Sequence, residues 1–440
     1  MTIPPPDDPT EGTTSPVAEP TPSDGTIDRP RWRRDAAVFL TSQTITLFGS
    51  MIVQYAIMWH LTLQTKSGSV MALAAVFGFL PQAVVSVFGG VWADRLNRKM
   101  LIIGADAMIA TATLALALSM LAGVDDLRLI YVALVIRSVG AGVQMPAVSA
   151  LLPQIVPTDK LMRVNGINGT IQSAMMLVAP AAAAALYAGW SIVAVFFVDI
   201  VTAVIGIGLL SLIAVPRLVR DLGAGGQRAG YFDDLVGGLR YAASHAFVRW
   251  VLGLYAVVFV LIVAPSYLTP LMVVRTFGAQ VWKLTALEIA FSVGMIIGGA
   301  LLATWGGLKN RVVMMVASTV ALGGLSVALG LSTNLWVFFG FMFLVGLAVP
   351  FFSTTSMTVL QETVEPEMQG RVFGFVGIVM AVAMPAGMVA FGPLADLFTV
   401  EAVLIASGVV TFLVVAAAVA LPSGRLAMDA AHRAPAGGTS

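Results

Sequence analysis

The sequence predicts an all-α membrane protein whose twelve transmembrane helices form two pseudo-symmetric six-helix bundles. Hydrophobic residues make up 58% of the 440-residue chain and charged residues only 11%, whereas a soluble domain is about 45 to 50% apolar. Apolar runs of about 20 residues, long enough to cross the hydrocarbon core as helices, recur along nearly the whole length. One long polar connection divides these runs six and six.

The segments are expected in the following order. Residues 1–34 form a disordered cytoplasmic tail, because their Pro, Thr, Asp and Glu content cannot offset the entropy of ordering. This tail lacks the apolar centre of a cleavable signal, so the first helix is the expected insertion signal. Residues 35–215 form the first bundle, 216–249 a cytoplasmic linker, 250–421 the second bundle and 422–440 a second tail. The expected helices are 36–60, 70–93, 100–122, 129–152, 166–188, 191–215, 250–274, 284–305, 312–331, 335–360, 371–397 and 400–421.

Three further features of the sequence concern the helix count, the linker and the relation between the two halves. Only Gly189 and Trp190 separate the fifth and sixth helices, so a single long hydrophobic region there is the alternative. Within the linker, the amphipathic stretch YFDDLVGGLRYAASHAF predicts a helix that lies along the membrane surface. VWADRLNRKM from Val91 aligns with TWGGLKNRVV from Thr304, which indicates that the two halves are related.

The distribution of basic residues predicts the orientation. Nineteen of the 24 Lys and Arg residues lie in connections on the same side as the amino terminus, four lie on the other side, and Arg137 lies within a helix. Since Lys and Arg are retained on the cytoplasmic side during insertion, both termini are expected in the cytoplasm. We expect a multi-pass protein of the cell (plasma or inner) membrane, in contact with the lipid bilayer and monomeric.

Composition also limits the chemistry. The chain has no cysteine and only three histidines, so we expect no metal site and no cofactor. The net charge of +1 gives no reason to expect a nucleic acid partner. The sequence contains no GxxxxGK[ST] phosphate loop and no HExxH motif, so neither direct use of ATP nor an intramembrane enzyme is expected. A receptor or scaffold that transports nothing is an alternative, disfavoured because no sizeable extramembrane domain is present.

The connection between the second and third helices carries a charged motif in an otherwise apolar region. GGVWADRLNRK resembles the GxxxDRxxRK signature loop of the major facilitator superfamily, with the residues Gly90, Asp94, Arg95, Arg98 and Lys99. An ordinary positive-inside loop would explain the basic residues but not the spacing of glycine and aspartate. The resemblance implies the major facilitator fold, in which two bundles rock around a central site.

Two further stretches narrow the resemblance. RSVGAGVQMPAVSALLPQIVPTDKLMRVNG and EPEMQGRVFG are similar to the macrolide-efflux and siderophore-exporter branch of drug:proton antiporters. This implies efflux of a small amphiphilic substrate such as a macrolide in exchange for protons, with export of a siderophore or other secondary metabolite as the alternative. The fifth helix has Ala179 and Pro180 followed by alanines, where antiporters usually show Gly-Pro and glycines. That departure leaves the exchange mechanism open.

The resemblance also implies a cytoplasmic gate. Asp94 is expected to face the start of the eleventh helix when the transporter is open to the outside, and a helix start stabilises a carboxylate by up to about 2 kcal/mol. Glu362 is also near enough in the topology to pair with the basic residues of the loop. Asp106 is expected to be a structural partner of that loop, with a role as a proton carrier as the alternative. A loop that only sets the topology is the alternative. The candidate gate residues are Gly90, Asp94, Arg95, Arg98, Lys99, Asp106, Glu365, Glu367 and Arg371.

Ionisable residues within the spans are candidates for proton coupling, since they are costly in hydrocarbon. Arg137 and Asp199 share a depth about two turns from the outer ends of their helices, which predicts a buried pair. That pair could be a fixed structural bridge or a site where protonation of Asp199 competes with pairing. Glu288, about one turn into the eighth helix, is the third candidate. Asp396, at a helix end, is expected to be hydrated.

The expected substrate cavity is broad and apolar with scattered hydrogen-bonding groups. The chain has 22 methionines and 23 phenylalanines, although many of these could pack or face lipid instead. A sugar would need more amides and carboxylates, and a nucleotide would need a basic cluster. The candidate cavity residues are Gln43, Gln54, Tyr55, Tyr255, Tyr267, Ser353 and Thr354.

Overall fold

The computed structural model describes residues 31–214, 240–241, 243–308 and 310–420, with the side chains of Val91, Asp94, Pro366, Glu367 and Gly370 excepted. Within these ranges the regular elements are helices, and twelve of the spans are long and apolar enough to cross a membrane. The predicted all-α fold with twelve crossings is therefore confirmed for this part of the chain. Residues 1–30 of the first predicted tail, the second tail and most of the linker, including the start of its amphipathic stretch, lie outside the described residues. Residues 32–34, which were predicted to belong to the first tail, are instead part of the first helix, which begins at Trp32.

The helices divide into two groups of six spans. The first bundle consists of α1 (Trp32–Thr65), α2 (Gly68–Arg95), α3 (Arg98–Leu121), α4 (Leu127–Ile155), α5 (Thr158–Gly189) and α6 (Ile192–Ser211). The second consists of α8 (Ala246–Tyr267) with α9 (Thr269–Met272) and the π turn η1 (Val273–Phe277), then α10 (Val281–Trp305), α11 (Arg311–Leu331), α12 (Leu335–Thr363), α13 (Pro366–Leu397) and α14 (Val400–Ala420).

Side-chain caps explain where several helices begin. Asn97 and Asn310, which the internal repeat aligns, cap α3 and α11, their side-chain oxygens accepting from the backbone N–H of Lys99 and of Val313 at 3.1 Å each. Ser191 caps α6, so the short break after Gly189 separates two helices rather than lying within one. Such caps satisfy N–H groups that have no partner inside the helix.

Several predicted helix boundaries differ from the observed ones by more than a turn, and two differences have a clear physical reason. The fifth helix begins at Thr158 rather than residue 166, because its first two turns are polar and project beyond the apolar window that hydropathy detects. The seventh span is not one regular helix. It is divided into α8, α9 and η1, where Pro265 and Pro270 lack the N–H donors that a continuous α-helix would use.

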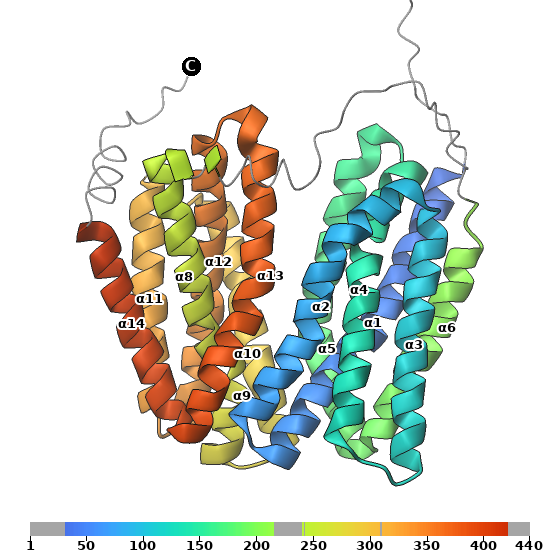
Figure 1. Cartoon of the computed structure of the whole chain (residues 1–440), viewed down its shortest axis with the longest axis horizontal. Coiled ribbons are helices and arrows are strands. Elements are labelled where there is room, and N and C mark those ends of the chain that lie inside the picture. Colours follow the sequence, from blue (N-terminus) through green and yellow to red (C-terminus); the bar gives the residue numbers. More distant parts are fainter. Residues whose placement is uncertain (1–30, 215–239, 242, 309, 421–440) are drawn as a thin grey trace, which may run out of the picture.

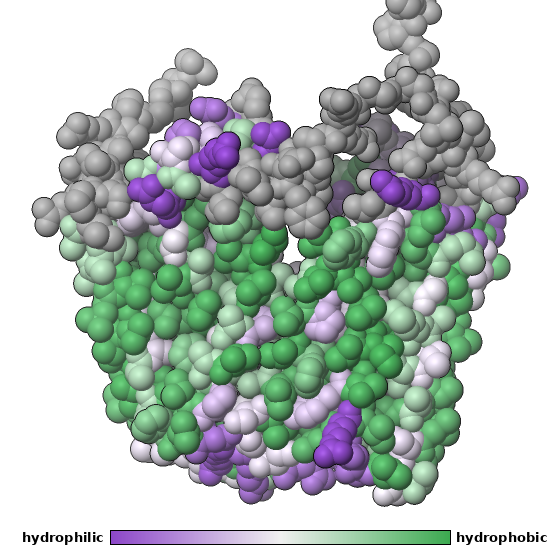
Figure 2. Space-filling view, in the orientation of Figure 1, coloured by the Kyte–Doolittle hydropathy of each residue, from purple (hydrophilic) through white to green (hydrophobic). Residues whose placement is uncertain are grey.

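The two bundles stand side by side, with α1 to α6 in one and α8 to α14 in the other (Figure 1). We call the end where α1 begins and α14 ends the terminal end, and the other the opposite end. The surface between the two ends is a band of hydrophobic side chains, with hydrophilic residues gathered at both ends (Figure 2). Exposed apolar side chains such as Val132, Val204 and Leu413 suit contact with lipid tails.

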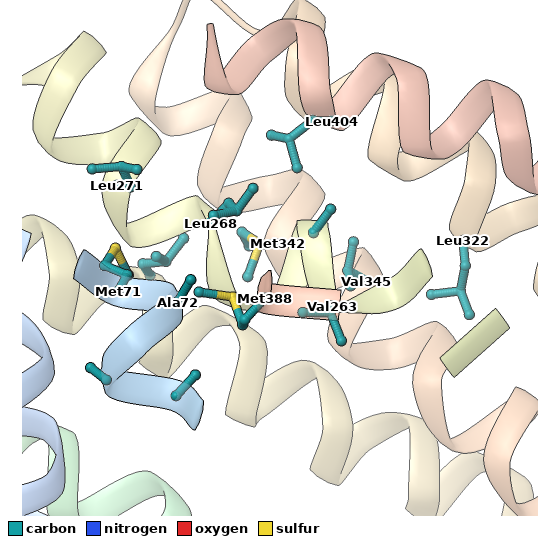
Figure 3. Packing of buried hydrophobic residues seen from close by; sticks show 14 of the residues in the cluster. Met71, Ala72, Val263, Leu268, Leu271, Leu322, Met342, Val345, Met388 and Leu404 are labelled. Atoms are coloured by element: carbon teal, nitrogen blue, oxygen red, sulfur yellow. The ribbon is translucent and has the colours of Figure 1, made fainter. Parts of the chain in front are cut away.

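The bundles meet at the opposite end and separate toward the terminal end. At the opposite end, a Cβ added to Gly392 of α13 would lie 2.5 Å from the carbonyl oxygen of Gly68 of α2. Beside this contact, Met71 and Ala72 of α2 pack near Met388 of α13 within one hydrophobic cluster (Figure 3). Nearer the terminal end, a Cβ on Gly166 of α5 or Gly374 of α13 would meet nothing within 4 Å. The space between the bundles is therefore closed at the opposite end.

Candidate functional site

A cavity of about 630 Å³ lies between the two bundles, and its lining residues extend from the middle of their helices toward the opposite end. Its wall is mostly apolar and is formed by α1, α2 and α5 of the first bundle and by α8, α9, α10, α12 and α13 of the second. Seven methionines from both bundles line it: Met51, Met58, Met71, Met176, Met342, Met380 and Met384. Because the thioether chain is unbranched and polarisable, such a wall can adapt to apolar ligands of different shape.

A few polar groups interrupt this wall. Gln54, Tyr55 and Tyr267, three of the residues predicted for the cavity, line it, as does Ser266. Glu288 lines it too, and it is the only ionisable acid or base other than tyrosine among the lining residues that the structure describes. The cavity thus combines a large apolar surface with one carboxyl group and a few hydroxyl and amide groups.

Other residues predicted for the cavity lie elsewhere. Tyr255 is buried in the second bundle, where its ring stacks on Phe352 at 5.8 Å between centroids, because its face of α8 packs against α12. Ser353 and Thr354 are not among the described lining residues, since they lie about one turn beyond Val349, which lines the cavity, toward the terminal end.

Gln43 is also absent from the described cavity wall. It belongs to the first half of α1, and its side-chain nitrogen is buried without a hydrogen-bond partner among the described residues. Gln43 thus lies nearer the terminal end than the described cavity wall, and its role in binding stays a prediction.

Arg137 and Asp199 form a buried ion pair inside the first bundle, with Nη1 of the arginine 2.6 Å from Oδ2 of the aspartate. Thr113 donates to the same carboxylate oxygen at 2.9 Å, and Ser50 donates to Oδ1 at 3.3 Å. Arg137 also donates to the Ser50 carbonyl at 3.3 Å. The network joins α1, α3, α4 and α6, away from the cavity wall, so the expected pairing is present and its hydrogen-bonding groups are well satisfied.

Asp106 has a different partner from the one expected. Its carboxylate accepts a hydrogen bond from the side-chain amide of Gln144 on α4, while its second oxygen is buried with no partner among the described residues. Lys99 instead donates to the carbonyl oxygens of Ser211 and Ile213 at 2.8 and 2.7 Å, at the end of α6. The expected pairing with the loop is wrong, because Asp106 lies about two turns along α3 from Arg98 and Lys99.

Apart from Asp106, the candidate gate residues lie at the terminal end. Gly90 and Asp94 belong to the last turns of α2, and Arg95 ends that helix. Glu365 occupies the N-cap position of α13 without a side-chain capping bond, and Glu367 and Arg371 follow within that helix. Arg98 donates to the carbonyl of Ala93 at 2.8 Å, within its own loop. Glu362, considered as a partner of the loop, pairs with Arg311 at 2.9 Å inside the second bundle. The side chains of Asp94 and Glu367 lie outside the described part of the chain.

One polar cluster at the opposite end was missed by the sequence analysis. Asp396 of α13 is not simply hydrated: it forms an ion pair with Arg275 of η1 and accepts hydrogen bonds from the start of α2. In the sequence, the one sign of this cluster is that Arg275 and Asp396 lie near helix ends. The groups that meet here come from three separate regions of the chain, so their contacts could not be predicted.

Two bundles of six spans, with an apolar cavity enclosed between them and closed at one end, define a secondary membrane transporter. Models of the Major Facilitator Superfamily match residues 39–320 and 282–435. The chain belongs to this superfamily.

Known relatives and solved structures agree with that assignment. Macrolide efflux protein A of Streptococcus pyogenes is 32% identical over 374 residues, which cover 83% of this chain and 90% of that protein. Its counterpart in Enterococcus faecalis is 32% identical over 331 residues, covering 73% and 100%. A bacterial homologue of the lysosomal transporter Spinster, inward-facing and unoccupied, matches with a TM-score of 0.63 at 13% identity, covering 91% and 98%. The nucleoside transporter NupG matches with a TM-score of 0.63 at 16% identity, covering 88% and 98%.

Proposed function

We propose that this transporter exports amphiphilic, macrolide-like compounds from the cytoplasm by alternating access, in exchange for protons. The observation that carries the proposal is the cavity, whose methionine-rich wall contains a single carboxyl group among its described residues. Such a wall favours a large apolar compound that is neutral or cationic over a sugar or an anion. The names of the relatives support the same class of cargo.

The proposed direction, export, is supported by the names of the relatives. If the terminal end is cytoplasmic, as the basic residues predict, the observed arrangement is open toward the cytoplasm and closed toward the outside. A cargo would then enter from the cytoplasm or the inner leaflet. In this proposal the protein acts as a monomer with one cavity and needs no cofactor.

Glu288 is the proposed proton-binding group, because it is the carboxyl group that the cargo would meet. A proton and a cationic cargo would compete for it, which couples their movements in opposite directions. Arg137 and Asp199 have each other as partners in a buried network, which supports a structural role. Substitutions at Glu288 and at the Arg137–Asp199 pair can therefore distinguish the proton-binding role from the structural role.

Transport in proteoliposomes tests the function. The purified protein is reconstituted with an imposed pH gradient and offered macrolides, lipophilic dyes and siderophores. We expect macrolide or dye flux toward the acidic side, and loss of its dependence on the gradient in Glu288→Gln. Glu401→Gln is the matched control, since Glu401 lies on α14 outside the described cavity wall and bonds Thr276 at 2.5 Å. Flux that does not depend on the pH gradient would contradict proton exchange. Selective flux of siderophores would show that the cargo is a siderophore and not a macrolide-like compound.

The terminal-end gate is a separate proposal. In the state open to the outside, Asp94 would lie against the start of α13, with Arg95, Arg98 and Lys99 facing acidic residues there. In the present arrangement Glu362 pairs with Arg311 and Lys99 donates to the carbonyl of Ser211, so both groups would change partners when this gate forms. We expect Asp94→Asn to reach the membrane and to transport more slowly, whereas unchanged turnover would leave only a topogenic role.

A further inference from the structure

We infer that Asp396 and Arg275 form a latch with residues 66–69 that holds the opposite end closed and sets how often the cavity opens there. This cluster, which we call the opposite-end latch, joins the second bundle to the connection between α1 and α2 of the first. The inference rests on the alternating access of the proposed function, but not on the identity of the cargo or on proton coupling.

The Asp396 carboxylate crosses from α13 to the first turn of α2. Its Oδ1 accepts from the backbone N–H of Gly68 at 2.7 Å, and its Oδ2 accepts from the N–H of Ser69 and the hydroxyl of Ser67, both at 2.8 Å. These N–H groups have no partner within α2, and the helix start carries partial positive charge. One carboxylate from the second bundle therefore completes a helix of the first.

Arg275 of η1 also links α13 to the connection between α1 and α2. Its Nη2 lies 2.6 Å from Asp396 Oδ1, and its Nε and Nη2 donate to the carbonyl oxygen of Lys66 at 2.9 and 2.6 Å. Nη1 donates to the carbonyl of Ala395 at the end of α13. The planar guanidinium thus ties a carboxylate and two backbone carbonyls from both bundles into one unit.

The backbone of the first bundle is shaped to meet this unit. Lys66 adopts a left-handed conformation with φ of 47°, which is uncommon for a residue other than glycine. It is the C-cap of α1, and the turn that it makes leads directly into the start of α2. The carbonyl of Lys66 and the N–H groups of Gly68 and Ser69 consequently meet the same two side chains.

The position of the latch suits a contact that must open. The side chains of Arg275 and Asp396 are 28% and 27% exposed, so water can replace their partners when the bundles part. Gly68, whose N–H donates to Asp396, is also in close backbone contact with Gly392. One turn along α2, Met71 and Ala72 pack near Met388 in the same apolar cluster (Figure 3), and Met71 also lines the cavity. The polar contacts of the latch and the apolar packing beside it must therefore break together when the opposite end opens.

Cysteine labelling tests the latch, because the chain contains no native cysteine. Ser266→Cys places one thiol on the cavity wall, and a membrane-impermeant maleimide is applied to right-side-out or inverted membrane vesicles. In the parent we expect faster labelling from the terminal-end side. Asp396→Asn should shift the ratio of the two rates toward the opposite end by about tenfold, the size expected for losing charge-assisted hydrogen bonds.

Controls separate a latch from general damage. Glu401→Gln removes a carboxylate at the same end that bonds only within the second bundle among its described contacts, and it should leave the ratio unchanged. Asp396→Glu keeps the charge and should restore part of the parent ratio. If Asp396→Asn does not reach the membrane, Ser67→Ala removes one hydrogen bond from the latch and should shift the ratio by about threefold.

Two outcomes would overturn the inference. The first is a parent-like ratio in Asp396→Asn, or in Ser67→Ala where that variant replaces it. The second is an equal shift in Glu401→Gln. Because labelling needs neither cargo nor a pH gradient, a latch failure is distinguishable from failure of the proposed export function.

Discussion

Replacing Asp199 with leucine should destabilise the protein strongly and identify the role of the buried pair. Asp199 is 2% exposed and Arg137 is 7% exposed, so Asp199→Leu leaves a guanidinium in the bundle interior without its counter-charge. The remaining partners of Arg137 are the Thr113 hydroxyl and the Ser50 carbonyl. Breaking a buried pair from one side costs about 3 to 5 kcal/mol.

The double variant Arg137→Met/Asp199→Leu is the informative comparison. Replacing both charges with apolar side chains of similar size is often neutral, because no uncompensated charge stays buried. We therefore expect the double variant to recover most of the stability that the single variant loses. The assay is the fraction of detergent-purified protein that remains monodisperse after heating, followed by transport in proteoliposomes.

Two results would contradict this reasoning. A single variant Asp199→Leu as stable as the parent would show that the pair does not support the first bundle. A double variant that is stable but has lost its dependence on the pH gradient would assign the pair to coupling and not to structure.

Three further changes have defined expectations. Glu288→Gln should leave thermal stability unchanged while removing the pH dependence of transport; a loss of stability would make Glu288 structural. Gly346→Ala should destabilise by about 1 to 3 kcal/mol, since its Cβ would overlap the carbonyl of Phe291 on α10. Gly340→Ala on the same helix meets nothing within 4 Å and is the control, so equal thermal stability of the two would contradict the packing argument. Asn310→Ala should cost about 1 kcal/mol through loss of the α11 cap, measured by the same heating assay; no change would show that water replaces the cap.

The sequence was sufficient for features that depend on local chemistry or on depth in the membrane. Apolar runs predicted the twelve spans because a helix must satisfy its own backbone in lipid. The alignment of Asn97 with Asn310 identified two positions that the structure shows to be helix caps. Arg137 and Asp199 were paired correctly because a shared depth and opposite charge leave few other partners.

Features that depend on how helices face one another could not be predicted. Tyr255 and Tyr267 lie on the same helix span and are chemically alike, yet only the second lines the cavity. Methionines that pack and methionines that line a cavity look identical in sequence. The opposite-end latch depends on three separate segments meeting, and Asp396 alone at a helix end carries no sign of its partners.

Distances between spin labels at the two ends test alternating access most directly. One cysteine pair, Met162 with Gln361, reports the terminal end, and a second, Val124 with Phe398, reports the opposite end; all four residues are exposed. With a macrolide present and the pH varied, we expect the terminal-end distance to shorten in the population in which the opposite-end distance lengthens. Distances that change together in the same direction, or that stay fixed while transport proceeds, would contradict the account.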